Sequence, residues 1–314
     1  GVSADGAFSF STALNVGADY AVSVRFHPNG QTCSIANGNG TLSEANVIDI
    51  AVSCISNPVA RFAYVVNASD NTVSMYTLNA STGQLRHNGY VEAGSAPSAI
   101  TVDPTGKFAY VANSGSANVS AYTINETTGA LTAIDADAMT TGVQHFAAGN
   151  GPSSVSIEPS GKYAYVTNSI DGAGGNSLSA YRIDTDTGAL IDIGTVATGA
   201  NPRGVSIDPS GRFAYVANYL SNDVSAYRID TSTGALASLG PTQAAGAQPR
   251  AVGIDPAGQF AYVVYADHVS AYRIDSATGM FASVGLSLAV DNDPRAIRID
   301  DSGRFAYLAN ANVV

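Results

Sequence analysis

Residues 152–168 read Pro-Ser-Ser-Val-Ser-Ile-Glu-Pro-Ser-Gly-Lys-Tyr-Ala-Tyr-Val-Thr-Asn. Val155 and Ile157 alternate with serines, which is typical of a strand with one apolar face. Glu158-Pro-Ser-Gly161 suits a type I turn, because proline presets φ at the second position and glycine is favoured at the fourth. Tyr163 to Asn168 is an aromatic and β-branched run, which favours a second strand. The segment therefore predicts a strand, a tight turn and a strand.

The same unit recurs along the chain. Full copies stand at Pro97–Asn113, Pro202–Asn218, Pro249–Tyr265 and Pro294–Asn310, and a copy of the second half stands at Phe62–Asn67. The second strands are expected to start at residues 62, 108, 163, 213, 260 and 305, a spacing of 45 to 55 residues. A third strand such as 224–229 follows, then a turn of the form Asp-x-x-Thr-Gly and a fourth strand such as 235–239. Four short antiparallel strands per repeat predict the blade of an all-β propeller.

These repeats resemble a known family. Tyr165-Val-Thr-Asn168 is the signature of the YVTN-repeat propellers, and the recurring Asp-Pro-x-Gly-Arg-Phe-Ala-Tyr-Val-Ala-Asn pattern is similar to the lactonase-type propellers related to 6-phosphogluconolactonase. The resemblance covers residues 57–314 and implies a β-propeller of four-stranded blades. Six blades are recognisable, the first and last of them in part. Because propellers close or cap their sheet edges, we expect seven blades natively and a polypeptide that continues beyond Val314.

Residues 1–56 lack the repeat and predict a separate small domain. Residues 7–10, 20–24 and 47–52 alternate as strands between clusters of Gly and Asn. The segments that contain Cys33 and Cys54 resemble the later half of a bacterial Ig-like β-sandwich. Such sandwiches have about 100 residues, so the resemblance implies a module whose first strands are missing here or supplied by another chain.

Cys33 and Cys54 are the two cysteines of the chain. Two buried free thiols are one interpretation. An even count within one small domain favours a disulfide between them. A metal site is a poor alternative, because 20 residues separate the two thiols and zinc sites usually carry closely spaced cysteine pairs. The disulfide in turn favours an extracellular or cell-surface location, in a bacterium if the Ig-like resemblance holds.

The charge of the chain excludes some partners. Asp and Glu number 25 against 14 Lys and Arg, for a net charge of −11. Nucleic-acid binders need clustered cations to replace phosphate counterions, and the sequence has no such cluster. The sequence has no apolar run of about 20 residues, the length of a membrane span. We therefore expect neither nucleic acid nor a lipid bilayer as the partner.

Two enlarged loops lie on the propeller face opposite the short Asp-Pro-x-Gly turns. Residues 134–151 contain His145 and Phe146, and residues 169–176 contain Asp171 and Asn176. Insertions gathered on one face are typical of a binding surface, so these four residues are candidates for partner contacts. The alternative is that both loops are tolerated surface insertions.

Three successive repeats begin with Pro-Arg. Because the first strand of a blade lines the central channel, Arg203, Arg250 and Arg295 are expected to approach one another at its mouth. Guanidinium groups held in this way suit a carboxylate or a phosphate. In the alternative interpretation, each arginine pairs with an aspartate of a neighbouring blade.

The lactonase resemblance bears on catalysis. Family members carry histidine at the position of Gly204, glutamate at the position of Tyr219, and another histidine in the segment that aligns with Ser153. Opening of a lactone needs a group poised to transfer a proton, so the departures predict that lactonase-type activity is absent. The acidic segments 135–137 and 291–293 lack the spacing of a calcium loop, and we expect neither a metal nor a cofactor.

Taken together, the sequence predicts a secreted or surface-displayed protein whose propeller binds a protein or glycan, or associates with itself into an extracellular assembly such as a filament. A lactonase-like hydrolase with a rearranged active site is the alternative.

Overall fold

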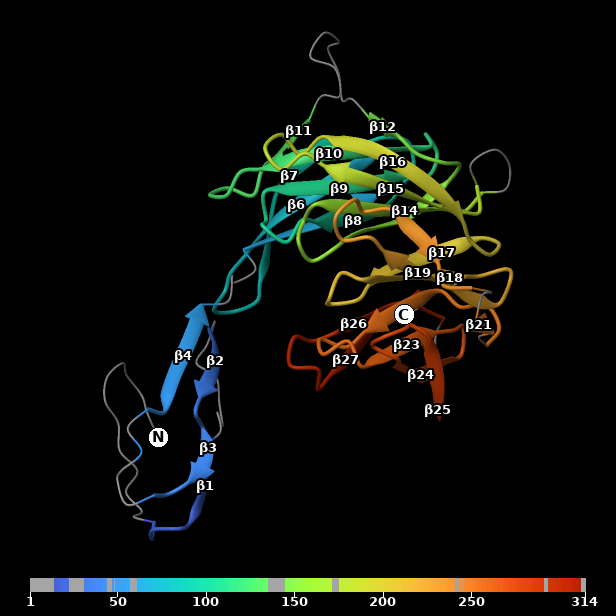
Figure 1. Cartoon of the computed structure of the whole chain (residues 1–314). Helices are drawn as coiled ribbons and strands as arrows, with labels where there is room; N and C mark the ends of the chain where they lie inside the picture. Colours follow the sequence, from blue (N-terminus) through green and yellow to red (C-terminus); the bar gives the residue numbers. More distant parts are fainter. Residues whose placement is uncertain are drawn as a thin grey trace. The chain divides into compact units, whose positions relative to one another are not determined.

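The structure is a computed structural model that describes residues 14–22, 31–43, 47, 49–56, 61–134, 145–170, 175–240, 243–244, 246–290 and 293–311. The chain divides into two compact units, residues 1–61 and 62–314. Every regular element in the described residues is a β-strand (Figure 1). No helix long and apolar enough to cross a membrane occurs among them.

The first unit contains two separate antiparallel ladders. β1 (Asp19–Ala21) pairs with β3 (Asn39–Thr41), and β2 (Gln31–Ala36) pairs with β4 (Ala51–Ser56). The strand predicted over 47–52 is observed four residues later, and the strand predicted over 7–10 lies outside the described residues. The Ig-like sandwich stays a prediction.

The register of β2 and β4 bears on the two cysteines. Cys33 and Cys54 are direct partners across the ladder. Directly opposite residues of an antiparallel pair have Cα atoms about 4.5–5.5 Å apart, which lies within the range that a disulfide spans. The side chains of both residues lie outside the described part of the structure, so the bond itself stays a prediction.

The described residues of the second unit form six antiparallel sheets, here called blades 1 to 6 in chain order. Blade 1 contains β5 (Phe62–Asn67), β6 (Thr72–Leu78) and β7 (Leu85–Glu92). Blade 2 contains β8 (Pro97–Val102), β9 (Phe108–Asn113), β10 (Asn118–Ile124), β11 (Leu131–Ala133) and β12 (His145–Ala147). Blade 3 contains β13 (Pro152–Ile157), β14 (Tyr163–Asn168), β15 (Ser177–Ile183) and β16 (Leu190–Ala197). Blade 4 contains β17 (Pro202–Ile207), β18 (Phe213–Asn218), β19 (Asp223–Ile229), β20 (Leu236–Ser238) and β21 (Gln243–Ala244). Blade 5 contains β22 (Ala251–Ile254), β23 (Phe260–Val264), β24 (His268–Ile274) and β25 (Phe281–Ala289). Blade 6 contains β26 (Pro294–Ile299) and β27 (Ala306–Asn310).

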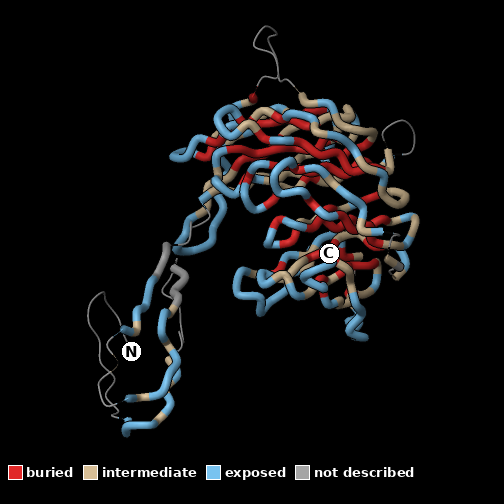
Figure 2. Tube along the Cα trace, viewed as in Figure 1, coloured by how far each residue is buried: buried red, intermediate tan, exposed pale blue. Residues whose placement is uncertain are grey.

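This architecture confirms the predicted propeller blades. Five of the six second strands start at the predicted residue, and the sixth starts at Ala306 instead of residue 305. The first strands β8, β13, β17, β22 and β26 contact one another in succession, so they line the propeller axis. Burial is concentrated in blades 2 to 4 (Figure 2), where every residue of β9, β14 and β18 is buried.

A repeated contact joins blades 1 to 5 in succession. In blades 1 to 4, the tyrosine of the Phe/Tyr-Ala-Tyr strand donates its hydroxyl proton to the carbonyl of the glycine in the Thr-Gly turn of the following blade. The four pairs are Tyr64 to Gly129 (2.9 Å), Tyr110 to Gly188 (2.9 Å), Tyr165 to Gly234 (2.9 Å) and Tyr215 to Gly279 (2.8 Å). The aromatic residue that starts the same strand packs its ring against that glycine. The contacts between blades 1 to 5 therefore recur once in each sequence repeat.

Candidate functional site

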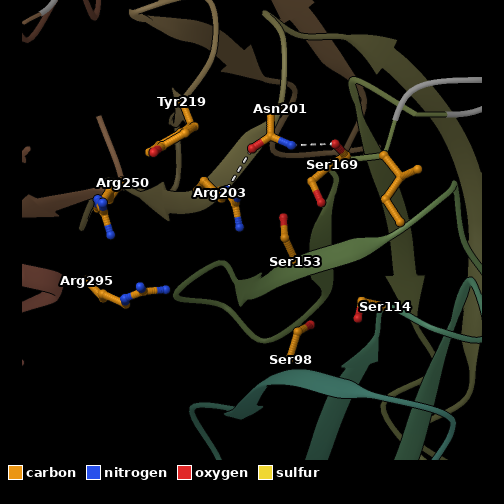
Figure 3. A pocket seen from close by; sticks show the side chains of 10 residues that line it. Ser98, Ser114, Ser153, Ser169, Asn201, Arg203, Tyr219, Arg250 and Arg295 are labelled. Atoms are coloured by element: carbon orange, nitrogen blue, oxygen red, sulfur yellow. Dashed lines mark hydrogen bonds between the residues drawn. The ribbon is translucent and has the colours of Figure 1, made fainter. Parts of the chain in front are cut away.

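A cavity of about 620 Å³ opens at the channel mouth, where the first strands start and the second strands end. Equivalent positions of blades 2 to 6 line it. The second position of the first-strand motif supplies Ser98, Ser153, Arg203, Arg250 and Arg295, and the residue after the second strand supplies Ser114, Ser169 and Tyr219. The arginines lie on one side and the serines on the other (Figure 3).

Arg203 is held by two neighbours. Its Nε donates to Oδ1 of Asn201 at 2.7 Å, and its guanidinium carbon lies 5.1 Å from the centroid of the Tyr219 ring. The guanidinium of Arg250 lies over the same ring, at 5.5 Å. Cations over an aromatic face are attracted by its quadrupole. Tyr219 thus brings the two arginines together at the cavity wall.

Asp293 joins the other pair of arginines. Its Oδ1 lies 2.5 Å from Nη2 of Arg250 and its Oδ2 lies 3.0 Å from Nη2 of Arg295. The side chain of Arg250 is 15% exposed, whereas that of Arg295 is 61% exposed. Two guanidinium groups therefore share one carboxylate, and with Arg203 the described residues of the cavity wall carry an excess of positive charge. Pairing with a neighbouring blade, the alternative drawn from the sequence, applies to Arg250 and Asp293.

The serine wall has the opposite hydrogen-bonding character. The hydroxyls of four serines donate to main-chain carbonyls: Ser98 to Pro152 (2.7 Å), Ser153 to Pro202 (2.7 Å), Ser114 to Ala96 (2.9 Å) and Ser169 to Gly151 (2.9 Å). A hydroxyl has one proton, so each of these oxygens offers lone pairs to a ligand. Guanidinium groups are donors without acceptors. The cavity therefore complements a molecule with an anionic end and a hydroxylated end.

Three of the four loop candidates, His145, Phe146 and Asn176, lie in the described residues, and none of the three lines this cavity. His145 and Phe146 are part of β12, which pairs with β10 at the edge of blade 2. Nδ1 of His145 lies 2.9 Å from Oγ of Ser120, and burial lowers the pKa of its imidazole from 6.5. Phe146 packs against the apolar core. Both residues thus stabilise a sheet, which corrects their assignment to a variable loop.

The remaining two candidates differ in their outcome. Asn176 supports the site, because its Oδ1 accepts a hydrogen bond from the main-chain N–H of Asn201 at 2.8 Å. Asp171 lies outside the described residues.

Asn201 and Asp293 have roles that sequence reasoning missed. Asp293 was considered as part of an acidic segment, whereas the structure uses it to bond two arginines. The available signal was its position directly before a Pro-Arg pair, which Asn201 shares. In the described residues, no group of three or more His, Cys, Asp or Glu side chains comes together as a metal site would require.

Comparison with known proteins supports the same architecture. The family model described as "Lactonase, 7-bladed beta-propeller" matches residues 29–143 and 135–252. No curated protein sequence matches the chain.

Solved structures match over most of the chain. A putative 6-phosphogluconolactonase from Bacteroides uniformis is 17% identical, with 83% of each chain covered and a TM-score of 0.65. A periplasmic gluconolactonase from Pseudomonas aeruginosa is 21% identical, with 83% of this chain and 80% of that chain covered and a TM-score of 0.65. A protein from Lactobacillus plantarum is 20% identical, with 94% and 88% covered and a TM-score of 0.64. At these identities the likeness concerns the fold.

Proposed function

The chain belongs to the lactonase family of seven-bladed β-propellers, and from this membership we propose that it is a lactonase-like hydrolase with a rearranged active site in the cavity at the channel mouth. The substrate is a hydroxylated lactone that carries a negatively charged group.

This proposal replaces the function predicted from the sequence. The secreted binding or assembly protein expected there is contradicted by the lactonase family match and by the lactonase structures among the neighbours. That prediction gave decisive weight to Gly204 and Tyr219, where the family carries proton-transfer groups. Loss of two side chains does not remove the arginines, and an arginine wall supports lactone opening in another way.

The observation that carries the proposal is the split polarity of the cavity. The donor-only arginine wall matches the oxygens of an anionic group and of a carbonyl that acquires negative charge. The serine wall, whose hydroxyl protons are donated to main-chain carbonyls, offers lone pairs to the hydroxyl groups of a sugar ring. A cavity of about 620 Å³ lies within the range of about 300–1,000 Å³ usual for small-molecule sites.

The reaction follows from this arrangement. Water adds to the lactone carbonyl carbon, and the carbonyl oxygen becomes an oxyanion. The ring C–O bond then breaks, and the proton released by water passes to the ring oxygen, which becomes a hydroxyl group. Arg250 is suited to the oxyanion, because Asp293 and the Tyr219 ring hold its guanidinium in place before the substrate arrives. Arg203 is suited to the fixed anionic group, because its partner is the uncharged Asn201 and its charge is not neutralised.

The departure at Gly204 has a physical reason. A Cβ at this position would lie 3.2 Å from the main-chain oxygen of Arg250 and 3.5 Å from Cα of Ala251. A side chain at this position would therefore start in tight contact with the main chain of blade 5, which favours glycine here. Catalysis here depends on electrostatic stabilisation by arginine in place of an imidazole.

A rate assay tests the proposal. The purified protein is expected to accelerate hydrolysis of 6-phosphogluconolactone above the spontaneous rate, with acid release followed in a pH-stat. The uncharged glucono-1,5-lactone should be hydrolysed with a higher KM, because it lacks the group that Arg203 binds. As a control, Arg182→Ala changes an exposed arginine of β15 and should leave both rates unchanged. Equality of the catalysed and spontaneous rates for both lactones would refute the proposal.

We also propose that the protein works in an oxidising compartment and that Cys33 and Cys54 are bonded. Support comes from their pairing directly across the β2–β4 ladder and from the rarity of stable disulfides in reducing compartments. Titration of the denatured, unreduced protein should find no free thiol, and reduction should release two, the full cysteine content. Two titratable thiols before reduction would remove the disulfide and the argument for location with it.

A further inference from the structure

The residue before the first-strand proline has a left-handed backbone in five blades. Its φ values are 49° at Ala96, 62° at Gly151, 54° at Asn201, 55° at Gln248 and 56° at Asp293. Proline disfavours helical backbone conformations in the residue before it, and residues with a Cβ rarely adopt positive φ. Such strain persists where the surrounding structure imposes it.

A main-chain bond accompanies this conformation in four of the five blades. The carbonyl of this residue accepts the N–H of the residue that follows the second strand, in Ser114 to Ala96 (3.0 Å), Ser169 to Gly151 (2.9 Å), Tyr219 to Asn201 (3.0 Å) and Ala311 to Asp293 (3.1 Å). The bond forms with alanine and glycine as well as with asparagine and aspartate. The backbone therefore leaves the identity of the side chain open.

The type of side chain before the proline instead follows the type of residue directly after the proline. Blades 2 and 3 combine Ala96 with Ser98 and Gly151 with Ser153. In blade 4, Asn201 accepts Nε of Arg203 at 2.7 Å. In blade 6, Asp293 accepts Nη2 of Arg295 at 3.0 Å and also bonds Arg250 of blade 5. A hydrogen-bond acceptor is thus found before the proline where an arginine follows in blades 4 and 6.

Asn201 is itself held firmly. Its Nδ2 donates to the carbonyl of Ser169 at 2.8 Å, and its main-chain N–H donates to Oδ1 of Asn176 at 2.8 Å (Figure 3 shows the bonds to Ser169 and Arg203). Its Oδ1 is therefore a fixed point for the guanidinium of Arg203. A flexible arginine side chain loses rotamer entropy when it becomes ordered. An acceptor that orders the arginine before binding reduces the entropy that is lost when the ligand binds.

We propose that the position before the first-strand proline determines the substrate specificity of the cavity: Asn201 and Asp293 are positioning residues that direct Arg203 and Arg295 at the charged group of the substrate. This inference rests on the proposed function. Two tasks are thus separated in the cavity. Asn201 positions Arg203 for recognition of the charged group, and Arg250 stabilises the negative charge on the lactone carbonyl oxygen.

Asn201→Gly gives a clean test, because Gly151 shows that glycine fits this backbone position. The variant removes the carboxamide and relaxes the strain. The matched control is Ala96→Gly, the same position in blade 2, where Ser98 follows in place of an arginine. For Asn201→Gly, KM for 6-phosphogluconolactone is expected to rise about tenfold, which corresponds to about 1.4 kcal/mol. The KM of Asn201→Gly for glucono-1,5-lactone should stay within about twofold of the wild-type value. The KM values of Ala96→Gly for both lactones should also stay within about twofold, a small change beside the tenfold rise.

The outcomes separate this inference from the proposed function. An unchanged KM for the phosphorylated lactone, or an equal rise for both lactones, would overturn the inference while activity of the wild type upholds the function. If the wild type hydrolyses neither lactone, the function fails, and calorimetric binding of 6-phosphogluconate decides the inference. Weaker binding by Asn201→Gly supports it, whereas equal binding or none overturns it. Asn201→Ala, which copies blade 2, replaces the glycine variant if that variant does not fold.

Discussion

An Arg250→Ala variant is expected to lose a factor of about 10²–10³ in kcat for both the phosphorylated and the uncharged lactone, the scale of losing one oxyanion donor. The guanidinium of Arg250 is held between Asp293 at 2.5 Å and the ring of Tyr219 at 5.5 Å. It is therefore oriented before any charge develops on the substrate. A donor of this kind stabilises the transition state more than the bound substrate, so kcat carries the loss. Initial rates over a range of substrate concentrations measure it.

Two further variants make this result interpretable. Arg250→Lys keeps the charge but loses the planar fork, so it should recover part of kcat. Arg182→Ala, in the exposed position of β15, should leave kcat unchanged. Because Arg250→Ala leaves Asp293 with Arg295 as its remaining arginine partner, thermal unfolding of each variant is measured as well. A folded Arg250→Ala variant with raised KM and unchanged kcat would contradict the oxyanion role.

Gly234→Ala is expected to lower the free energy of unfolding by about 3 kcal/mol or more, the sum of a left-handed alanine and overpacking. Gly234 has φ +75°, and an added Cβ would lie 2.6 Å from Cε1 and 2.7 Å from Cγ of Tyr163. Tyr163 is 5% exposed, and its hydroxyl donates to the carbonyl of Ser232 at 2.7 Å. The ring therefore has little freedom to move aside. Denaturant unfolding measures the loss.

Gly83→Ala is the matched control for the packing part of this effect. Gly83 ends the equivalent turn of blade 1 with φ +74°, and a Cβ there would meet no atom within 4 Å. The control should lose about 1–2 kcal/mol, the cost of the backbone conformation alone. The difference between the two variants then isolates the contact between blades. Equal losses would show that the ring does not resist displacement.

The repeats made most of the propeller predictable. A strand-turn-strand unit with a fixed spacing allows few arrangements, so the second strands start where the sequence predicts, apart from the one-residue shift at Ala306. The meeting of Arg203, Arg250 and Arg295 in one cavity also followed from their equivalent positions in successive blades. Residues at equivalent positions of the repeats can thus be predicted to lie near one another even when they are far apart in the sequence.

Features that depend on one local backbone conformation were not predictable in this way. Asp293 itself has a left-handed backbone directly before Pro294, and this conformation sets the direction of its side chain. The residue type alone does not reveal such a conformation. β12 has three residues, too few to show an alternating pattern, so the sequence predicts a loop at His145 and Phe146. The prediction of function depends on Gly204 and Tyr219, which stand where the family carries histidine and glutamate, and the family match contradicts it. The sequence alone does not reveal that blade 5 approaches Gly204 closely.

The contact between blades has a consequence for how such a chain can change over time. Blades 2 to 4 each carry a tyrosine that bonds the following blade and a Thr-Gly turn that accepts the tyrosine of the preceding blade. A duplicated repeat would therefore arrive with both halves of the contact and would fit beside any other copy. The residues at the channel mouth take no part in that contact, so a gene built from such copies can diversify its chemistry at the mouth while its assembly stays the same.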